Sequence, residues 1–160
     1  IAQEIAAEVK DHLAENTLLL GPGSTCKLIK ETLGLSASQT TLLGFDLYSP
    51  GKPWVLDLTS LQIKEQAGRI ERVIVSFTRG QGFLFGRGNQ QLDGDLLSTF
   101  AWPDQYLLVG TRTKLLSLSG RPLLVDTGDS NLNASFRGLT EITTGYEDRV
   151  VHLVDFEQGS

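Results

Sequence analysis

The sequence predicts an α/β fold, with a layered, mostly parallel sheet flanked by helices. Short apolar runs alternate along the chain with amphipathic segments, which is the order that a parallel sheet with crossover helices requires. Several of these runs contain no alternating polar residues, which is typical of strands buried on both faces. The chain has 160 residues, of which 40% are hydrophobic and 21% charged, so we expect residues 1–160 to form one domain with a substantial core.

The first half of the chain predicts helices at residues 1–13, 24–34 and 59–68. Apolar residues recur every four positions in the first helix, and the second has Ser24 or Thr25 as N-cap and Gly34 as its end. The third begins at a Thr-Ser pair and ends at Gly68. Apolar runs between them predict strands at residues 17–21, 40–48, 54–58 and 69–77.

The second half begins with a glycine-rich loop, residues 80–92, in which we expect Phe83 and Phe85 to pack in the core. Short helices are predicted around residues 93–100, 113–118 and 130–136. Strands are predicted at residues 105–110, 122–126, 139–145 and 149–154. No internal repeat or linker interrupts this pattern.

Composition argues against several classes of function. The net charge is −5 and there is no run of Lys or Arg, so we expect no nucleic-acid partner. No apolar run approaches the roughly 20 residues needed to span a bilayer, so we expect no membrane partner. The single cysteine, Cys26, excludes an internal disulfide, supports no metal site and is consistent with the cytoplasm. Because the sequence begins with Ile1 and contains no Met, we expect a fragment of a longer protein.

No catalytic residue is assigned from the sequence. His12 and His152 have no companions that suggest a catalytic triad. Ligands of open α/β sheets collect beyond the carboxyl ends of the strands, and three glycine-containing segments follow predicted strands.

The first segment is "GPGST", residues 21–25, between a strand and a helix. Its backbone N–H groups and hydroxyls are suited to an anion at the positive end of the helix. The alternative is a tight turn with a Ser or Thr cap. The candidate ligand-binding residues here are Gly21, Gly23, Ser24 and Thr25.

The second segment is "GQGFLFGRGNQQL", residues 80–92. Glycine inside a regular element costs about 0.5–1 kcal/mol relative to alanine, so this density of glycine indicates tight turns or a ligand close to bare backbone. An arginine offers a fork of donors for phosphate, and amide side chains both donate and accept hydrogen bonds. Alternatively, the arginine pairs with an aspartate and the glutamines face water. The candidate residues are Gly80, Gly82, Gly86, Arg87, Gly88, Asn89 and Gln90.

The third segment is "LLVDTGDSN", in which Asp126 ends a strand and Thr127 opens the turn that follows. A carboxylate at this position is suited to a pair of hydroxyl groups or to a metal-bound water. It is equally suited to capping the next helix.

The segments "GPGST", "TLLGFDL", "GQGFLFGRGNQQL", "RPLLVDTGD" and "TGYEDRVVHLV" together closely resemble the C-terminal half of the ATP-NAD kinase-like proteins, in the branch associated with acetoin catabolism. The resemblance covers residues 1–154. It implies a longer protein whose N-terminal domain carries a GGDG motif and phosphorylates the ribose 2′-hydroxyl of NAD, with ATP or polyphosphate and a divalent metal.

On this resemblance, the chain is a substrate-side or regulatory domain that works with its own N-terminal kinase domain on NAD or a related nucleotide or sugar diol. No GGDG occurs in the 160 residues, so we expect this piece alone to bind no cofactor and to transfer no phosphate.

The first 50 residues also resemble the first unit of sugar-phosphate isomerases, in an arrangement similar to that of the CoA transferase-like proteins. This resemblance leaves open a phosphosugar- or nucleotide-binding module without catalysis. A further alternative is that the glycine loops shape the interface of a homo-oligomer.

If residues 21–25 and 80–91 form one phosphate site, the substitution Arg87→Ala removes a charge-assisted contact of roughly 1.5–3 kcal/mol and weakens ligand binding by about 10- to 100-fold. Gly88→Val does similar harm by blocking the approach of the ligand to the backbone. Calorimetric titration of NAD, NADP, ATP and sugar phosphates measures both effects, with folding checked by circular dichroism. Equal binding by the wild type and both variants would contradict the expectation.

Overall fold

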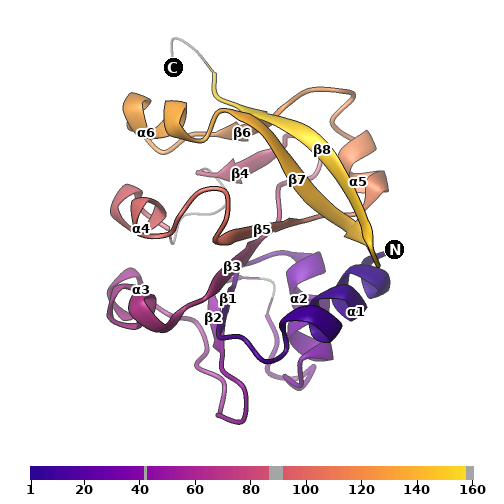
Figure 1. The fold of residues 1–160 in the computed structure, drawn as a ribbon, viewed down its shortest axis with the longest axis vertical. Coiled ribbons are helices and arrows are strands. Elements are labelled where there is room, and N and C mark those ends of the chain that lie inside the picture. The colour runs from indigo at the N-terminus through magenta and orange to yellow at the C-terminus, as the bar shows by residue number, and fades with distance from the viewer. Residues whose placement is uncertain (42, 87–91, 158–160) are drawn as a thin grey trace.

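The computed structural model of the chain describes residues 1–41, 43–86 and 92–157 (Figure 1). Its helices are α1 (Ala2–Leu13), α2 (Ser24–Thr32), α3 (Ser60–Gln66), α4 (Gly94–Thr99), α5 (Arg112–Leu116) and α6 (Ser130–Ser135), with a short 3-10 turn η1 (Ala67–Arg69). Its strands are β1 (Leu18–Leu20), β2 (Asp46–Tyr48), β3 (Arg72–Val75), β4 (Phe83–Phe85), β5 (Tyr106–Val109), β6 (Leu123–Val125), β7 (Gly138–Gly145) and β8 (Asp148–Asp155). The predicted α/β class is confirmed.

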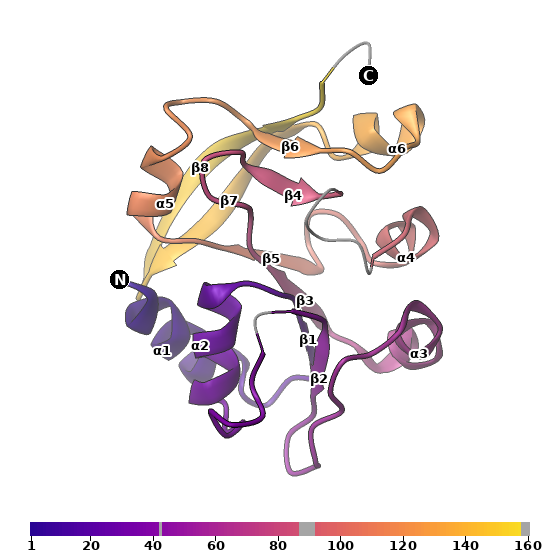
Figure 2. The ribbon, with the colours of Figure 1, turned by 180° about the vertical axis from the view of Figure 1, so that it is seen from behind.

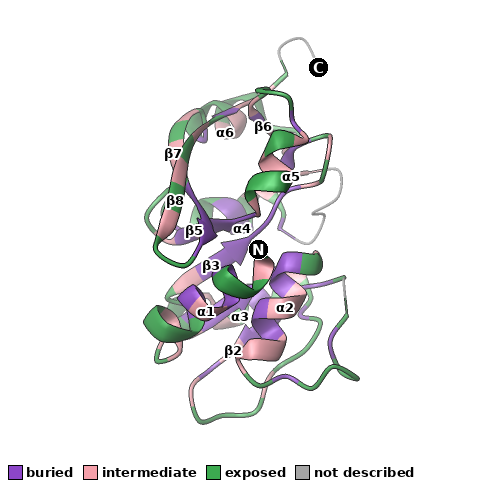
Figure 3. Ribbon diagram, turned by 90° about the vertical axis from the view of Figure 1, so that its right-hand side faces the viewer, coloured by how far each residue is buried: buried purple, intermediate pink, exposed green. Residues whose placement is uncertain are grey.

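Within the described residues the strands form one sheet in the order β2-β1-β3-β5-β7-β8-β6-β4. Neighbouring strands are parallel except in the pairs β1–β2 and β7–β8, so the prediction of a mostly parallel sheet is confirmed. The sheet is mixed, however, and curls strongly into a half-barrel, as Figure 3 shows from the side. The curl was not predicted, because it depends on pairing between strands that are distant in the sequence.

The β7–β8 hairpin reverses the direction of the sheet. Strands β1, β3, β5 and β7 run one way, and β8, β6 and β4 run the other. Figure 2 shows β4 and β6 pointing toward α4 and α6, on the side away from α2 and α5. The carboxyl ends of the first group therefore lie at the opposite edge of the sheet from those of β4 and β6.

Strand β1 illustrates how the sheet is covered on both faces. All three of its leucines are 0% exposed. Successive side chains of a strand point to opposite faces, so Leu19 packs in the core inside the curl while Leu18 and Leu20 pack under α1 and α2. Ile5 and Val9 of α1 belong to this second cluster. An uninterrupted apolar run is what a strand buried on both faces needs.

The core inside the curl is rich in aromatic side chains. Phe85, Trp102, Tyr106 and Phe136 contact one another, and the ring centroids of Trp102 and Phe136 are 4.9 Å apart. The Tyr106 hydroxyl donates to the Leu97 carbonyl at 2.9 Å, and burial raises the pKa of Tyr106. The prediction that Phe83 and Phe85 pack in the core is confirmed.

Three local predictions were wrong. Residues 54–58 form no strand, because only Val55 bridges to Leu47 and Asp57 then adopts a left-handed conformation with φ of 52°. Of the described residues in the range 40–48, only the last three form a strand. Conversely, residues 83–85 lie in strand β4 rather than in a loop, because they pair with β6 across a long sequence separation.

A buried ion pair joins α2 to β2. The Lys30 side chain is 0% exposed, and its Nζ lies 2.8 Å from Oδ2 of Asp46, whose side chain is 4% exposed. The other carboxylate oxygen of Asp46 accepts a hydrogen bond from Asp57 N at 2.7 Å. The pair therefore fixes the edge strand and the segment that returns beside it to the helix.

Lys30→Met should destabilise the chain by about 3–5 kcal/mol, because it leaves a buried carboxylate without its counter-charge. The double variant Lys30→Met/Asp46→Asn should recover most of the loss, since the amide keeps an acceptor for Asp57 N and carries no charge. Urea unfolding of the three proteins measures the free energies. An equal loss of unfolding free energy in the single and double variants would contradict this account.

Candidate functional site

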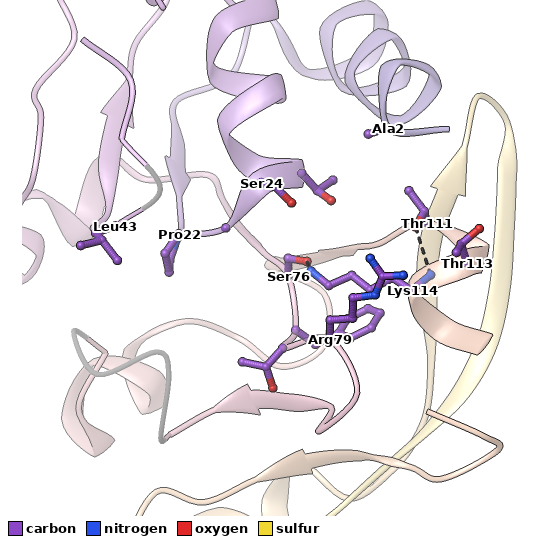
Figure 4. A pocket seen from close by; sticks show the side chains of 13 residues that line it. Ala2, Pro22, Ser24, Leu43, Ser76, Arg79, Thr111, Thr113 and Lys114 are labelled. Atoms are coloured by element: carbon purple, nitrogen blue, oxygen red, sulfur yellow. Dashed lines mark hydrogen bonds between the residues drawn. The ribbon is translucent and has the colours of Figure 1, made fainter. Parts of the chain in front are cut away.

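A pocket of about 440 Å³ lies at the carboxyl ends of the parallel strands β1, β3 and β5 (Figure 4). Its walls are the segments that follow these strands, namely residues 22–25, residues 76–79, and Thr111, Thr113 and Lys114. Ala2 and Leu43 complete the lining. Because parallel strands end at the same edge, their loops meet there. The pocket therefore occupies the position at which open α/β sheets bind ligands.

The first wall is the start of helix α2. Gly23 is the N-cap residue, with φ of 107°, and Ser24 and Thr25 form the first turn of the helix. The N–H groups of a first turn have no partner within the helix, and the helix dipole adds positive potential there. Because a glycine occupies the cap position, neither hydroxyl serves as the cap. Gly21 lies behind this wall, where its N donates to the Ile74 carbonyl at 2.9 Å.

A serine and a lysine form the floor of the pocket. Nζ of Lys114, on α5, donates to Oγ of Ser76 at 3.0 Å and lies 5.2 Å from the centroid of the Phe77 ring. Ser76 is 5% exposed. Burial lowers the pKa of Lys114, and the nearby Arg79 lowers it further, while Cys26 opposes this change. The ammonium group is thus poorly solvated, which favours contact with an anion.

The start of α5 is held by a helix cap and by an ion pair to β8, and this positions Lys114. Thr111 caps the helix, its Oγ1 accepting from Lys114 N at 3.1 Å. Arg112 binds Asp148 of β8 through two hydrogen bonds of 2.9 and 2.8 Å. Hydrogen bonds from Arg112 and then Thr144 lower the pKa of Asp148 to about 2. The lysine therefore stands on a turn anchored to the sheet.

The described lining residues make the pocket electropositive and polar on one side. Arg79 is exposed and lies beside Lys114, and no described lining residue carries a carboxylate. Pro22 and Leu43 form an apolar side, across the cavity in Figure 4, and Leu43 is 77% exposed. Two cations, several hydroxyls and a helix N-terminus are suited to an anionic, hydroxyl-bearing ligand.

The second glycine segment begins at this edge of the sheet. Residues 78–83 form a tight turn in which Phe83 N donates to Thr78 Oγ1 at 2.9 Å. Gly80 lies within it, and its N donates to Ser117 Oγ at 3.1 Å. Gly80 and Gly82 therefore shape the turn that carries Arg79, and neither lines the pocket.

Three other predicted site residues, Gly86, Asp126 and Thr127, are not brought to the pocket. Gly86 follows β4 and lies at the opposite edge, where a Cβ atom would stand 2.0 Å from the Asp126 carbonyl oxygen. Asp126 and Thr127 follow β6 at that same edge, and Thr127 Oγ1 donates to Asn133 Oδ1 at 2.6 Å. The other predicted residues, Arg87, Gly88, Asn89 and Gln90, lie outside the described residues.

Sequence reasoning missed Ser76, Arg79, Thr111 and Lys114. The rule that ligands collect beyond parallel strands applies to residues 76–79 and 111–114 as well, but these segments contain no glycine-rich motif that would indicate a site. Among the described residues no group of three or more Asp, Glu, His or Cys side chains is placed to hold a metal, and no helix is long and apolar enough to cross a membrane.

Strands β1, β3 and β5, which end at the pocket, lie in a part of the chain that matches a known protein family. A profile of the ATP-NAD kinase C-terminal domain matches residues 13–154. The chain belongs to this family. Comparisons with curated proteins and with solved structures gave no match. The family match confirms the predicted relationship to ATP-NAD kinase C-terminal domains, and it contains β1, β3, β5 and α5.

Lys114→Met should weaken the binding of inorganic phosphate by about 10- to 100-fold, because it removes a charge-assisted hydrogen bond. Since the pKa of Lys114 is lowered, wild-type affinity should be intact at pH values below that pKa and fall as the pH rises through it. The decline should begin at a lower pH than for an ordinary lysine. Calorimetry at several alkaline pH values measures this, and Lys52→Met is the matched control. A variant with wild-type affinity would exclude Lys114 from the site.

Proposed function

We propose that this chain is the ligand-binding, substrate-side domain of an ATP-NAD kinase-like phosphotransferase, and that its pocket holds a phosphate group of NAD or a related nucleotide. The observation that carries the proposal is the meeting of Lys114, Ser76 and the N-terminus of α2 at the carboxyl ends of three parallel strands. Membership of the ATP-NAD kinase C-terminal family supports a dinucleotide as the ligand.

Each part of the pocket has a separate task in this proposal. The first-turn N–H groups of α2 and the Lys114 ammonium bind the phosphate oxygens, because both present positive potential to the same cavity. Ser76 orients the ammonium through its 3.0 Å hydrogen bond. Arg79 provides a second cationic contact from the rim, and the hydroxyls of Thr111 and Thr113 are placed for ribose hydroxyls.

The apolar side favours a nucleotide over a simple phosphosugar. Leu43 and Pro22 face the cavity across from the cations, and the 77% exposed side chain of Leu43 offers apolar surface that a bound ring would cover. A nucleotide has a ring system that packs on such a surface, whereas a sugar phosphate offers mainly hydroxyls. The phosphosugar-binding module without catalysis, suggested by the resemblance of residues 1–50 to sugar-phosphate isomerases and CoA transferase-like proteins, is the alternative.

The transfer chemistry is assigned to a separate N-terminal kinase domain of the longer, cytoplasmic protein, with ATP and a divalent metal bound there. The described residues provide no cluster of metal ligands, so no metal-dependent step is placed in the pocket. Membership of the branch associated with acetoin catabolism rests on the sequence resemblance alone. The proposal that Gly86, Asp126 and Thr127 also contact ligand concerns the opposite edge of the sheet, where a second part of the longer protein or of its ligand would have to reach them. Arg87, Gly88, Asn89 and Gln90, proposed for the same role, lie outside the described residues.

Calorimetric titration of NAD, NADP, ATP and ribose 5-phosphate into the chain tests the ligand class. We expect the nucleotides to bind. Leu43→Ser should weaken the binding of the nucleotides more than the binding of ribose 5-phosphate, and Lys114→Met should weaken the binding of every compound. No NADP should form when the chain is incubated with NAD, ATP and magnesium.

Three outcomes would count against parts of this assignment. Binding of ribose 5-phosphate alone would favour the phosphosugar module. NADP formation by the purified chain, abolished by Lys114→Met, would place the chemistry in this domain. If none of these compounds bound, the pocket would not be the nucleotide site and the proposal would be wrong.

A further inference from the structure

A second hollow, of about 210 Å³, lies between α1 and the sheet. The second half of α1 forms one side of it, and α1 lies beside the end of β7 (Figure 1). The other side takes one residue from each of four strands, β3, β5, β7 and β8: Arg72, Leu107, Thr143 and Arg149. The hollow shares no residue with the candidate pocket, which lies at the other end of β3.

Arg72 brings a buried donor to this hollow. It is the first residue of β3, and its Nε is buried without a hydrogen-bond partner among the described residues. A buried donor that lacks an acceptor is costly, and more so when it belongs to a charged group. An acceptor bound in the hollow would therefore stabilise the position that the Arg72 side chain already has.

Arg149 adds a second guanidinium group. Its side chain is exposed and lines the same hollow. Across the β7–β8 ladder it pairs with Thr143, which is 3% exposed and contributes a hydroxyl group to the lining. Neither Arg72 nor Arg149 forms an ion pair with another residue in the described part of the chain. The hollow thus contains two cationic forks without a protein counter-ion.

The acidic residue of the hollow, Glu8 of α1, is engaged elsewhere. Its Oε1 accepts a hydrogen bond from Glu147 N at 2.7 Å, and its Oε2 lies 2.9 Å from Nε2 of His12. Both carboxylate oxygens therefore have partners other than the two arginines.

We propose that this hollow binds a phosphate group through the guanidinium groups of Arg72 and Arg149. The planar fork of a guanidinium matches the oxygens of a phosphate, with two parallel hydrogen bonds from each arginine. A phosphate ester carries a charge of about −1.5 to −2 at pH 7, which two arginines balance. A single carboxylate would balance only one of them.

The space beside the hollow has room for the rest of a phosphate ester. A larger hollow of about 460 Å³ is lined by the same four residues of the sheet, together with Asp104 and Glu141. These two carboxylates do not line the smaller hollow, so they do not repel a phosphate there directly. They are suited to accept hydrogen bonds from hydroxyl or amino groups of a ligand.

The Nε–Hε signal of Arg72 in nitrogen–proton correlation NMR spectra tests the site directly. It is independent of the proposed function, because Arg72 and Lys114 lie toward opposite ends of β3. Titration with inorganic phosphate should move this signal to saturation. Arg149→Met should raise the phosphate concentration at half-saturation by about 10- to 100-fold, because it removes a charge-assisted contact.

The matched control is Lys10→Met, which removes an exposed positive charge from α1 outside the lining and should leave the midpoint almost unchanged. Ribose 5-phosphate distinguishes the sources of the phosphate group: a lower midpoint than that of inorganic phosphate identifies an ester, and an equal midpoint identifies free phosphate. Circular dichroism confirms the folding of each variant. An Arg72 signal that phosphate does not move, a wild-type midpoint in Arg149→Met, or an equal loss in Lys10→Met would overturn the proposal.

Discussion

The parallel pairing of β1, β3 and β5 is the constraint on which the rest of the structure depends. Evenly spaced backbone hydrogen bonds between these strands bring their carboxyl ends to one edge, and the three loops that follow then enclose a cavity. The covering helices follow from the same constraint, because a strand of three fully buried leucines is stable only when both faces are covered.

The chemistry of the pocket comes from polar and charged side chains that are not needed to stabilise the sheet. A lysine whose pKa is lowered by burial is unfavourable in isolation, and it is retained next to a serine hydroxyl at the floor of an open cavity. The buried pair of Lys30 and Asp46 differs, because there the counter-charge is present and the ion pair joins two elements of the fold. Within the part of the chain that the structure describes, Lys114 forms no ion pair with a carboxylate, and this is why its burial supports a site for an anion.

The β7–β8 hairpin has two consequences for function. It reverses the direction of the sheet, so that the segments after β4 and β6 lie at the edge opposite the pocket. Its outer face is packed against α1 near Thr143 and Arg149, and it carries exposed apolar side chains at Leu139, Val151 and Leu153.

The sequence by itself determined the α/β class, most of the helices, the buried central strands and the family, because periodicity, glycine stops and motif spacing are local properties. It also indicated the start of α2 as an anion site, since a strand, a glycine turn and a helix suffice to define one. Tertiary structure decided the curl of the sheet, the strand at residues 83–85 and the separation of Gly86 and Asp126 from Ser24, because strand direction depends on pairing between distant segments. It also decided the place of Lys114, which becomes a site residue only when the fold brings α5 beside Ser76 at the end of β3.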